Sequence, residues 1–278
     1  MLLELGPLRL DVTYRSVVVG ILNRTPDSFY DAGTYFEFDE FLAKAEGLVG
    51  DGADVLDVGG VKAGPGPEVS LDEELERVVP AIAALHDRFD VALSCDTWKA
   101  AVAAEAYAAG AVVGNDISGF ADPAYLLEAA RAGASVVATH MRLGPRIPDP
   151  DPVYVDVVGD VCRFLSERAG QATAAGIPAQ RIMLDAGLDL GKTEWQSLEL
   201  LRNSDQLVAV GFPVYLSASN KRFLGHLLGT EVSDRREATQ AAHALGIGLG
   251  CRIVRAHDVR GARRVSDVMA AILEARAS

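Results

Sequence analysis

Short apolar runs that alternate with helical segments are the feature that most constrains the fold of this chain. Each run is rich in Val, Ile, Leu and Ala, as in strands buried on both faces, and a longer Ala-, Leu- and Glu-rich segment follows it. The predicted strands are Val17–Leu22, Asp54–Val58, Val91–Cys95, Ala111–Gly114, Ser135–Thr139, Ile182–Leu184, Val214–Leu216 and Arg252–Val254. The predicted helices are Asp39–Asp51, Leu71–Asp87, Trp98–Ala109, Ala124–Ala132, Val153–Ala175, Glu194–Asn203, Lys221–Leu249 with a possible split near Gly229, and Val259–Ala275.

The number and order of these elements predict the fold. Eight strands alternate with eight helical segments over 278 residues, and no linker or charged run divides them. This pattern is typical of an α/β protein with a single-domain (β/α)8 TIM barrel spanning residues 1–278. The alternative, an open doubly wound sheet, is disfavoured because no G-x-G-x-x-G follows the first strand. Pro80 should end or kink the helix in which it lies.

Charge and cysteine content limit the partners and the location. A formal net charge of −13 disfavours nucleic acid, since phosphate binding needs a basic face. No apolar run approaches the roughly 20 residues of a membrane span, and Met1–Leu10 lacks the pattern of a signal peptide. Cys95, Cys162 and Cys251 lie far apart, in or beside apolar runs, without metal-ligand spacing. We therefore expect reduced cysteines in a cytoplasmic protein that binds neither nucleic acid nor membrane.

Polar side chains end or follow each predicted strand. The carboxyl ends of parallel barrel strands meet on one face, so these side chains should gather there. A single Asp or Asn at such a place often caps the next helix instead. Capping does not explain why a lysine, an arginine and a histidine should share the same rim. The strand-end residues are Asn23, Asp57, Asp96, Asn115, Asp116, His140, Asp185, Ser217, Ser219, Asn220, Lys221, Arg255, His257 and Asp258.

These strand-end residues predict two parts of one ligand. Asp96, Asn115 and Asp185 offer acceptors and an amide, which suits a flat, nitrogen-rich heterocycle whose edge alternates donors and acceptors. Asn23 is placed to reach a phosphate oxygen or a metal ion bound to it. The residues that offer donors to an anion are Lys221, Arg255 and His257. The residues alone thus suggest a heteroaromatic substrate that carries a phosphate or diphosphate.

Several motifs run in order from the first strand to the last and cover nearly the whole chain. They are G-I-L-N-R-T-P-D-S-F (20–29), D-V-G-G (57–60), P-G (65–66), D-T-W-K (96–99), N-D-I-S-G (115–119), D-A-G-L-D-L-G-K (185–192), S-N-K (219–221) and R-A-H-D-V (255–259). In these motifs the chain resembles the dihydropteroate synthase family. The first motif and N-D-I-S-G are the most specific.

The resemblance implies a (β/α)8 barrel, usually a homodimer, that acts as a transferase in folate biosynthesis. The family joins 4-aminobenzoate to 6-hydroxymethyl-7,8-dihydropterin diphosphate and releases diphosphate. The implied cofactor is Mg2+ bound to the diphosphate and contacted by Asn23. Thr25, Pro26 and Asp27 would lie in a mobile first loop that closes over the site. The residues implied to hold the pterin are Asp96, Asn115, Asp185 and Lys221, and those implied in catalysis are Lys221, Arg255 and His257, the last two binding the leaving diphosphate.

Three loops depart from the family pattern. The second loop usually reads D-I-G-G-E-S-T-R-P-G, but here Gly60 is followed by V-K-A-G-P-G, so its Ser, Thr and Arg are absent. Lys62 is a candidate replacement cation or else a solvated loop lysine, and an ammonium does not copy a bidentate guanidinium. Arg222 stands where the family has the serine that contacts the aminobenzoate carboxylate, and it would either bind that group or fill the pocket. Asp189 replaces a glycine and adds negative charge near an anionic substrate, unless it faces away.

These departures leave three hypotheses open. The first is a working dihydropteroate synthase with divergent loops. The second is a paralogue that binds a pterin but has lost or changed the aminobenzoate reaction, with a different acceptor or no catalysis. The third is a pterin-binding methyltransferase barrel, which shares the Asp/Asn/Asp floor but is disfavoured by the first-strand and last-strand motifs.

Overall fold

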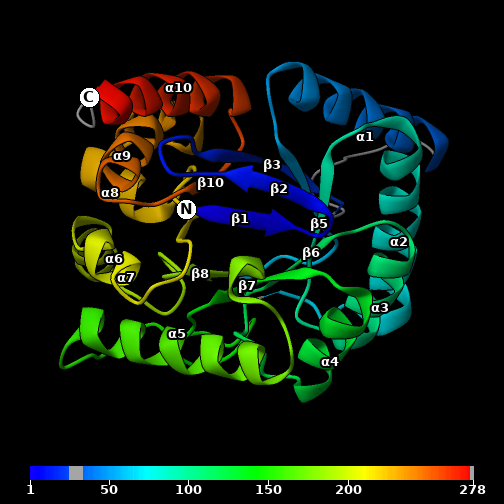
Figure 1. Cartoon of the computed structure of the whole chain (residues 1–278), viewed down its shortest axis with the longest axis horizontal. Coiled ribbons are helices and arrows are strands. Elements are labelled where there is room, and N and C mark those ends of the chain that lie inside the picture. Colours follow the sequence, from blue (N-terminus) through cyan, green and yellow to red (C-terminus); the bar gives the residue numbers. More distant parts are fainter. Residues whose placement is uncertain (25–33, 65, 276–278) are drawn as a thin grey trace.

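Eight parallel strands form the central sheet of the computed structural model, which describes residues 1–24, 34–64 and 66–275. A parallel bridge between Leu184 and Val214 joins the sixth strand to the segment before the seventh, so that the sheet closes on itself. This confirms the predicted (β/α)8 barrel (Figure 1). The strands are β3 (Val17–Asn23), β4 (Val55–Gly59), β5 (Ala92–Asp96), β6 (Val113–Asp116), β7 (Ser135–Thr139), β8 (Ile182–Asp185), β9 (Tyr215–Leu216) and β10 (Ile253–Ala256).

Helices surround the barrel strands, as Figure 1 shows. Gly229, at φ 64°, ends α8, so the predicted split of the long segment near this residue is confirmed. None of the helices in the described part of the chain has the length and apolar character that crossing a bilayer requires. The α-helices are α1 (Thr34–Gly50), α2 (Leu71–Arg88), α3 (Ala100–Ala108), α4 (Pro123–Ala132), α5 (Val157–Ala174), α6 (Glu194–Arg202), α7 (Ser204–Val208), α8 (Arg222–Leu228), α9 (Arg236–Gly248) and α10 (Val259–Ala275), and short 3-10 helices cover Ala179–Arg181 and Val232–Asp234.

The limits of several helices differ from the sequence prediction, among them α1, which begins at Thr34 rather than at Asp39. Pro80 does not end α2, which continues to Arg88 because Val78 and Ile82, on either side of the proline, are fully buried. Packing of the apolar face thus outweighs the local penalty of proline. Helix α5 begins at Val157 rather than at Val153, because the Asp156 carboxylate accepts a hydrogen bond from the Gly159 amide and caps the helix there.

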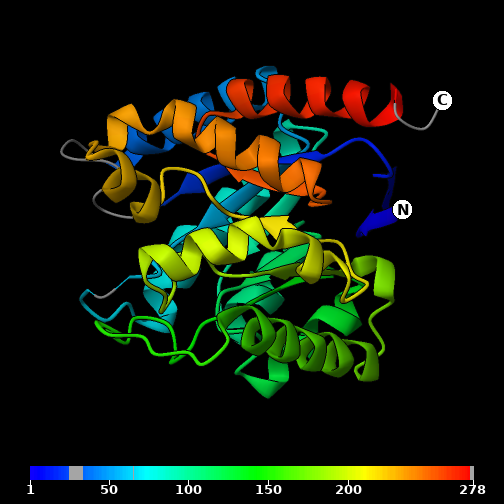
Figure 2. The ribbon, with the colours of Figure 1, turned by 90° about the vertical axis from the view of Figure 1, so that its left-hand side faces the viewer.

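An N-terminal hairpin that the sequence reasoning missed covers the amino-terminal end of the barrel. It pairs β1 (Leu2–Leu5) with β2 (Leu8–Asp11) in antiparallel register. Leu3 and Leu5 are buried in the same cluster as the apolar residues that fill the barrel lumen. Figure 2 shows the hairpin at the end opposite the loops that follow the strands. The hairpin therefore closes the bottom of the barrel and leaves the other end for a site.

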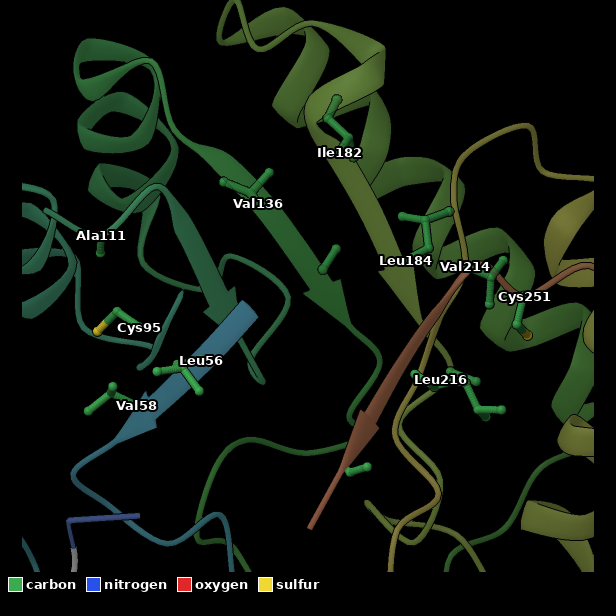
Figure 3. Packing of buried hydrophobic residues seen from close by; sticks show 14 of the residues in the cluster. Leu56, Val58, Cys95, Ala111, Val136, Ile182, Leu184, Val214, Leu216 and Cys251 are labelled. Atoms are coloured by element: carbon green, nitrogen blue, oxygen red, sulfur yellow. The ribbon is translucent and has the colours of Figure 1, made fainter. Parts of the chain in front are cut away.

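Two apolar layers hold the strands in place. The outer layer lies between strands and helices, and Figure 3 shows its members on β4 and β8, such as Leu56, Val58 and Leu184. The inner layer fills the lumen with residues such as Val19, Val55 and Met183. Because side chains alternate along a strand, the two layers fix which residues face inward.

Candidate functional site

The alternation of side chains continues from the apolar lumen into a polar floor at the carboxyl ends of the strands. Asp57 lies two residues after the inward Val55, and Asp185 lies two residues after the inward Met183. Across the sheet, Asp57 is paired with Ser94, and Asp96 with Asn115. The floor residues, all in the inward register, are Asn23, Asp57, Asp96, Asn115, Asp185 and Arg255. The expected gathering is therefore present for these six residues, whereas the Asp116 carboxylate accepts hydrogen bonds from the Ser118 and Phe120 amides of its own loop.

Asp57 is the centre of this floor, although the sequence reasoning gave it no role in the site. It is fully buried, and its Oδ1 accepts a hydrogen bond from Ser94 Oγ at 2.5 Å. Its Oδ2 accepts from Asn115 Nδ2 at 3.1 Å and from Arg255 Nε at 2.6 Å. Asp57 thus orients both an amide and a guanidinium. The sequence signal that could have identified Asp57 is its spacing. It lies two residues after Val55, on the same face of the strand.

Arg255 spans two carboxylates of the floor. Its Nη2 donates to Asp96 Oδ2 at 2.8 Å, while its Nε donates to Asp57. Burial raises the pKa of Asp96, Arg255 opposes this rise, and Asp57 adds to it. Burial alone would lower the pKa of Arg255, but the two carboxylates raise it instead. The guanidinium is therefore part of the acidic floor, and its predicted contact with diphosphate would be shared with Asp57 and Asp96.

A second group of charges surrounds Asp185 on the loop after β8. The buried Asp185 accepts a hydrogen bond from the Gly187 amide at 2.7 Å. Lys221, which precedes α8, donates from Nζ to the Leu188 carbonyl at 2.9 Å. Burial lowers the pKa of Lys221, whereas Asp185 raises it. This arrangement brings a carboxylate and an ammonium to the same side of the floor, as predicted.

Lys192 shapes this loop, and the sequence reasoning quoted it only as part of a motif. Its buried Nζ donates to the carbonyl oxygens of Gly187 and Leu190, both at 2.9 Å, and of His140 at 3.2 Å. Burial lowers the pKa of His140 to about 3, so its Nδ1, 2.9 Å from Lys192 Nζ, is a neutral acceptor. Lys192 therefore holds the backbone of the loop from a buried position in the wall of a cavity.

The remaining predicted residues occupy the outer rim. The exposed His257 contacts Ser219 Oγ through Nδ1 at 3.0 Å, and its backbone amide donates to the same oxygen at 3.1 Å. Lys62 and Arg222 have exposed side chains. Arg222 lines a cavity of about 610 Å³, whereas Lys62 does not. Thr25, Pro26 and Asp27 lie outside the described residues.

The cavity that Arg222 lines is walled by three loops that follow barrel strands. It lies between the loop after β4, the long loop after β7 and the loop after β8. Its lining includes Ala63, Arg146, Asp149, Asp189, Glu194 and Arg222. A volume of this size is ordinary for a small-molecule site.

Arg146, from the long loop after β7, fastens the second loop and was also missed. Its Nη1 donates to the Lys62 carbonyl at 3.0 Å, its Nη2 to the Pro67 carbonyl, and its backbone amide to the Ala63 carbonyl at 3.2 Å. A guanidinium therefore returns to the second loop, but it comes from a different strand end. No local motif marks it, because the contact depends on where the two loops meet.

Asn23 offers the oxygen that the predicted magnesium ion would need. A side chain at Gly59 would place its Cβ 3.6 Å from Asp96 Oδ2 and 3.7 Å from Asn23 Oδ1, so the glycine leaves open space beside both oxygens. The described residues contain no cluster of three or more His, Cys, Asp or Glu that would form a cage for a metal ion. Mg2+ in phosphate-binding sites commonly uses one or two protein oxygens together with phosphate oxygens and water. The donor set fits such an ion.

Comparison with known proteins agrees with this geometry. The family model of pterin-binding enzymes matches residues 19–257. An inactive dihydropteroate synthase 2 of Mycobacterium leprae (strain TN) is 44% identical over 266 residues, which are 93% of this chain and 91% of the relative. The dihydropteroate synthase of Bacillus subtilis (strain 168) is 39% identical over 269 residues, 96% and 92% of the two chains.

A solved structure of a dihydropteroate synthase is also similar to this chain in three dimensions. The dihydropteroate synthase of Xanthomonas albilineans with 4-aminobenzoic acid superimposes with a TM-score of 0.90 at 37% identity, covering 98% of this chain and 97% of that chain. The floor of inward-facing carboxylates and the match over residues 19–257 lead to the same conclusion. The chain belongs to the family of pterin-binding enzymes.

Proposed function

We propose that the chain is a dihydropteroate synthase-type transferase, which binds 6-hydroxymethyl-7,8-dihydropterin diphosphate on the polar floor and joins it to an arylamine such as 4-aminobenzoate. The observation that carries this proposal is the row of carboxylates and an amide at Asp57, Asp96, Asn115 and Asp185, facing one lumen. Such a row matches the alternating donors and acceptors of a pterin edge. The family match and the relatives named dihydropteroate synthase support the same reaction class.

The floor is suited to a dissociative transfer. In this reaction the C–O bond to diphosphate breaks with its electron pair on oxygen, the amine lone pair forms the new C–N bond, and the nitrogen then loses a proton. The carboxylates of Asp96 and Asp185 would favour positive charge that develops on the pterin. Arg255, His257 and Lys221 would face the leaving diphosphate, whose negative charge they stabilise.

Mg2+ is proposed as the cofactor, with Asn23 Oδ1 as its protein ligand. When bound, it would neutralise charge on the diphosphate oxygens. The open space that Gly59 leaves beside the side-chain oxygens of Asn23 and Asp96 supports this assignment. Arg255 donates a hydrogen bond to Asp96 Oδ2 and would thereby fix the orientation of that carboxylate within the floor.

A second candidate function is pterin binding without synthase turnover. It is favoured by the 44% identity to a relative named inactive dihydropteroate synthase 2 and by the absence of Ser, Thr and Arg from the second loop. In this case the floor would bind the pterin, while the acceptor would be different or missing.

We also propose a cytoplasmic homodimer. The three cysteines are unpaired in the structure, as is usual in a reducing compartment. Large apolar side chains are exposed on α8 and α10, a feature of faces that pair with another chain. They are Leu227, Leu228, Val268 and Ile272.

The experiment that tests the function combines product detection with binding. The purified protein would receive dihydropterin diphosphate, 4-aminobenzoate and Mg2+, with dihydropteroate followed by mass spectrometry and each substrate titrated by calorimetry. Product at an enzymatic rate supports the synthase, and pterin binding without product supports the second candidate. Asp185→Asn should weaken pterin binding about fivefold or more, because a charge-assisted contact is lost. Unchanged affinity would remove Asp185 from the site.

A further inference from the structure

Glu74 is a fully buried carboxylate that lies outside the polar floor. It belongs to the first turn of α2, on the outer side of the barrel (Figure 1). A buried charge is costly unless it is both paired and hydrogen-bonded. The partners of Glu74 must therefore compensate this cost, and they show which part of the chain the carboxylate serves.

Two residues of the D-T-W-K motif are these partners. Thr97, which is also fully buried, donates from Oγ1 to Glu74 Oε1 at 2.6 Å. Lys99 forms an ion pair with the same carboxylate, with Nζ 3.0 Å from Oε2. Thr97 Oγ1 also accepts a hydrogen bond from the Lys99 amide at 3.2 Å. One carboxylate of α2 thus organises the segment that connects β5 to α3.

This connecting segment directly follows Asp96 of the floor. Side chains alternate in direction at the end of a strand, so Asp96 reaches inward to Arg255 while Thr97 reaches outward to α2. The Thr97 amide donates to the Asn115 carbonyl at 3.1 Å and so continues the pairing of β5 with β6. Glu74 therefore holds from outside the same strand end that Arg255 holds from inside.

The carboxylate also connects this strand end to the second loop. Lys99 Nζ, which Glu74 binds, donates to the Val69 carbonyl at 2.9 Å, where the second loop ends. Where that loop begins, a Cβ at Gly60 would lie 2.8 Å from Val78 Cγ2 and 3.4 Å from Glu74 Cγ. The last glycine of the D-V-G-G motif thus lets the loop lie directly on α2. A change at Glu74 should reach both the end of β5 and the second loop.

We propose that Glu74 is a positioning residue for the pterin site, which fixes Asp96 through Thr97 and Lys99 without touching the substrate. The hydroxyl and the ammonium of the D-T-W-K motif then serve this carboxylate and not a ligand. The proposal rests on the proposed binding of dihydropterin diphosphate to the floor. It gives a role to three side chains that the transfer reaction itself does not use.

The first test removes the hydroxyl of Thr97 and keeps the shape of the side chain. Calorimetry of the full chain with dihydropterin diphosphate and Mg2+ compares the wild type with Thr97→Val and Thr97→Ser. Thr97→Val leaves the buried Glu74 without its hydroxyl donor, and binding should weaken about tenfold. Thr97→Ser keeps the donor, and its affinity should stay within about twofold of the wild type. Equal losses in both variants, or no loss in Thr97→Val, overturn the proposal.

The second test removes the charge of Glu74 and decides the question where Thr97→Val does not fold. Glu74→Gln keeps an acceptor for Thr97 but loses the ion pair with Lys99, and binding of the pterin diphosphate should weaken about fivefold. Thermal unfolding checks the fold of each variant. Unchanged affinity in Glu74→Gln overturns the proposal.

Glu4→Gln is the matched control for this charge. The Glu4 side chain is 12% exposed and pairs with Arg181 at 2.9 Å, but it lies in β1 at the opposite end of the barrel. Glu4→Gln should therefore reduce thermal stability and leave the affinity for the pterin diphosphate within about twofold. If it weakens binding as much as Glu74→Gln does, general loss of stability explains the effect and the proposal is overturned.

Failure of the proposed function has a different signature. No binding of dihydropterin diphosphate by the wild type overturns both the function and the positioning role that rests on it. Binding by the wild type that neither Thr97→Val nor Glu74→Gln weakens overturns the positioning role alone.

Discussion

Replacing Arg255 with alanine should be the most damaging single change to the floor. The guanidinium is 15% exposed, and it holds a fully buried Asp57 and an Asp96 whose side chain is 18% exposed. Without it, two neighbouring carboxylates lose the guanidinium that binds them both. Breaking a buried ion pair from one side costs roughly 3–5 kcal/mol, because the remaining charge stays buried without a partner. We expect a loss in the free energy of unfolding of about that size at pH 8 for Arg255→Ala.

The same variant should respond to pH in a defined direction. Burial raises the pKa of Asp96, and Arg255 is the group that opposes this rise. Without Arg255 the folded state holds the proton of Asp96 still more strongly than the unfolded state does. A carboxyl with a raised pKa in the folded state loses stability as pH increases through the window between its unfolded and folded pKa values. The deficit of Arg255→Ala should therefore be smaller at pH 5 than at pH 8.

Urea unfolding at both pH values measures these quantities, and Arg236→Ala provides the control. Arg236 pairs with Asp258 at 2.8 Å, but its side chain is 67% exposed. An exposed pair of this kind contributes about 0–1 kcal/mol. If Arg255→Ala destabilises the protein no more than Arg236→Ala does, or if its deficit shrinks at high pH, the reasoning about the floor is refuted.

Two further predictions concern the second loop and the response to acid. Arg146→Ala should lower the free energy of unfolding by roughly 1–3 kcal/mol, since two side-chain hydrogen bonds to the second loop are lost. Arg146→Lys should recover little of this stability, because one ammonium group does not replace the two N–H donors of the planar guanidinium. Urea titration decides this, and equal stability of all three proteins would contradict it. His243 is fully buried with both ring nitrogens unpartnered among the described residues, and burial lowers its pKa to about 4. The folded state then takes up this proton later than the unfolded state, so stability should decline by roughly 2 kcal/mol as pH falls from about 6.5 toward 4. His243→Leu should flatten this decline in thermal unfolding, and an unaltered pH profile would exclude His243 as its source.

Much of the barrel could be predicted because its signals are local. A strand such as Val17–Asn23 is apolar along its length since both faces are buried, and the run itself reveals this. The hairpin at Leu2–Asp11 was missed because its exposed half resembles an ordinary polar terminus until the barrel end beneath it is known. Helix α2 was expected to end or kink at Pro80; it does not end there, because buried residues on both sides of the proline hold the helix in place as far as Arg88.

The fold class and the residues at the strand ends could be predicted from the amino-acid sequence, because strand period and helix period are properties of neighbouring residues. Asp96, Asn115, Asp185 and Arg255 could be chosen as candidates on that basis alone. The contacts that those residues make became known from the three-dimensional structure. Asp57 becomes the centre of the floor through partners 37, 58 and 198 positions away in the chain. Contacts of this kind depend on closure of the barrel, which no local pattern contains.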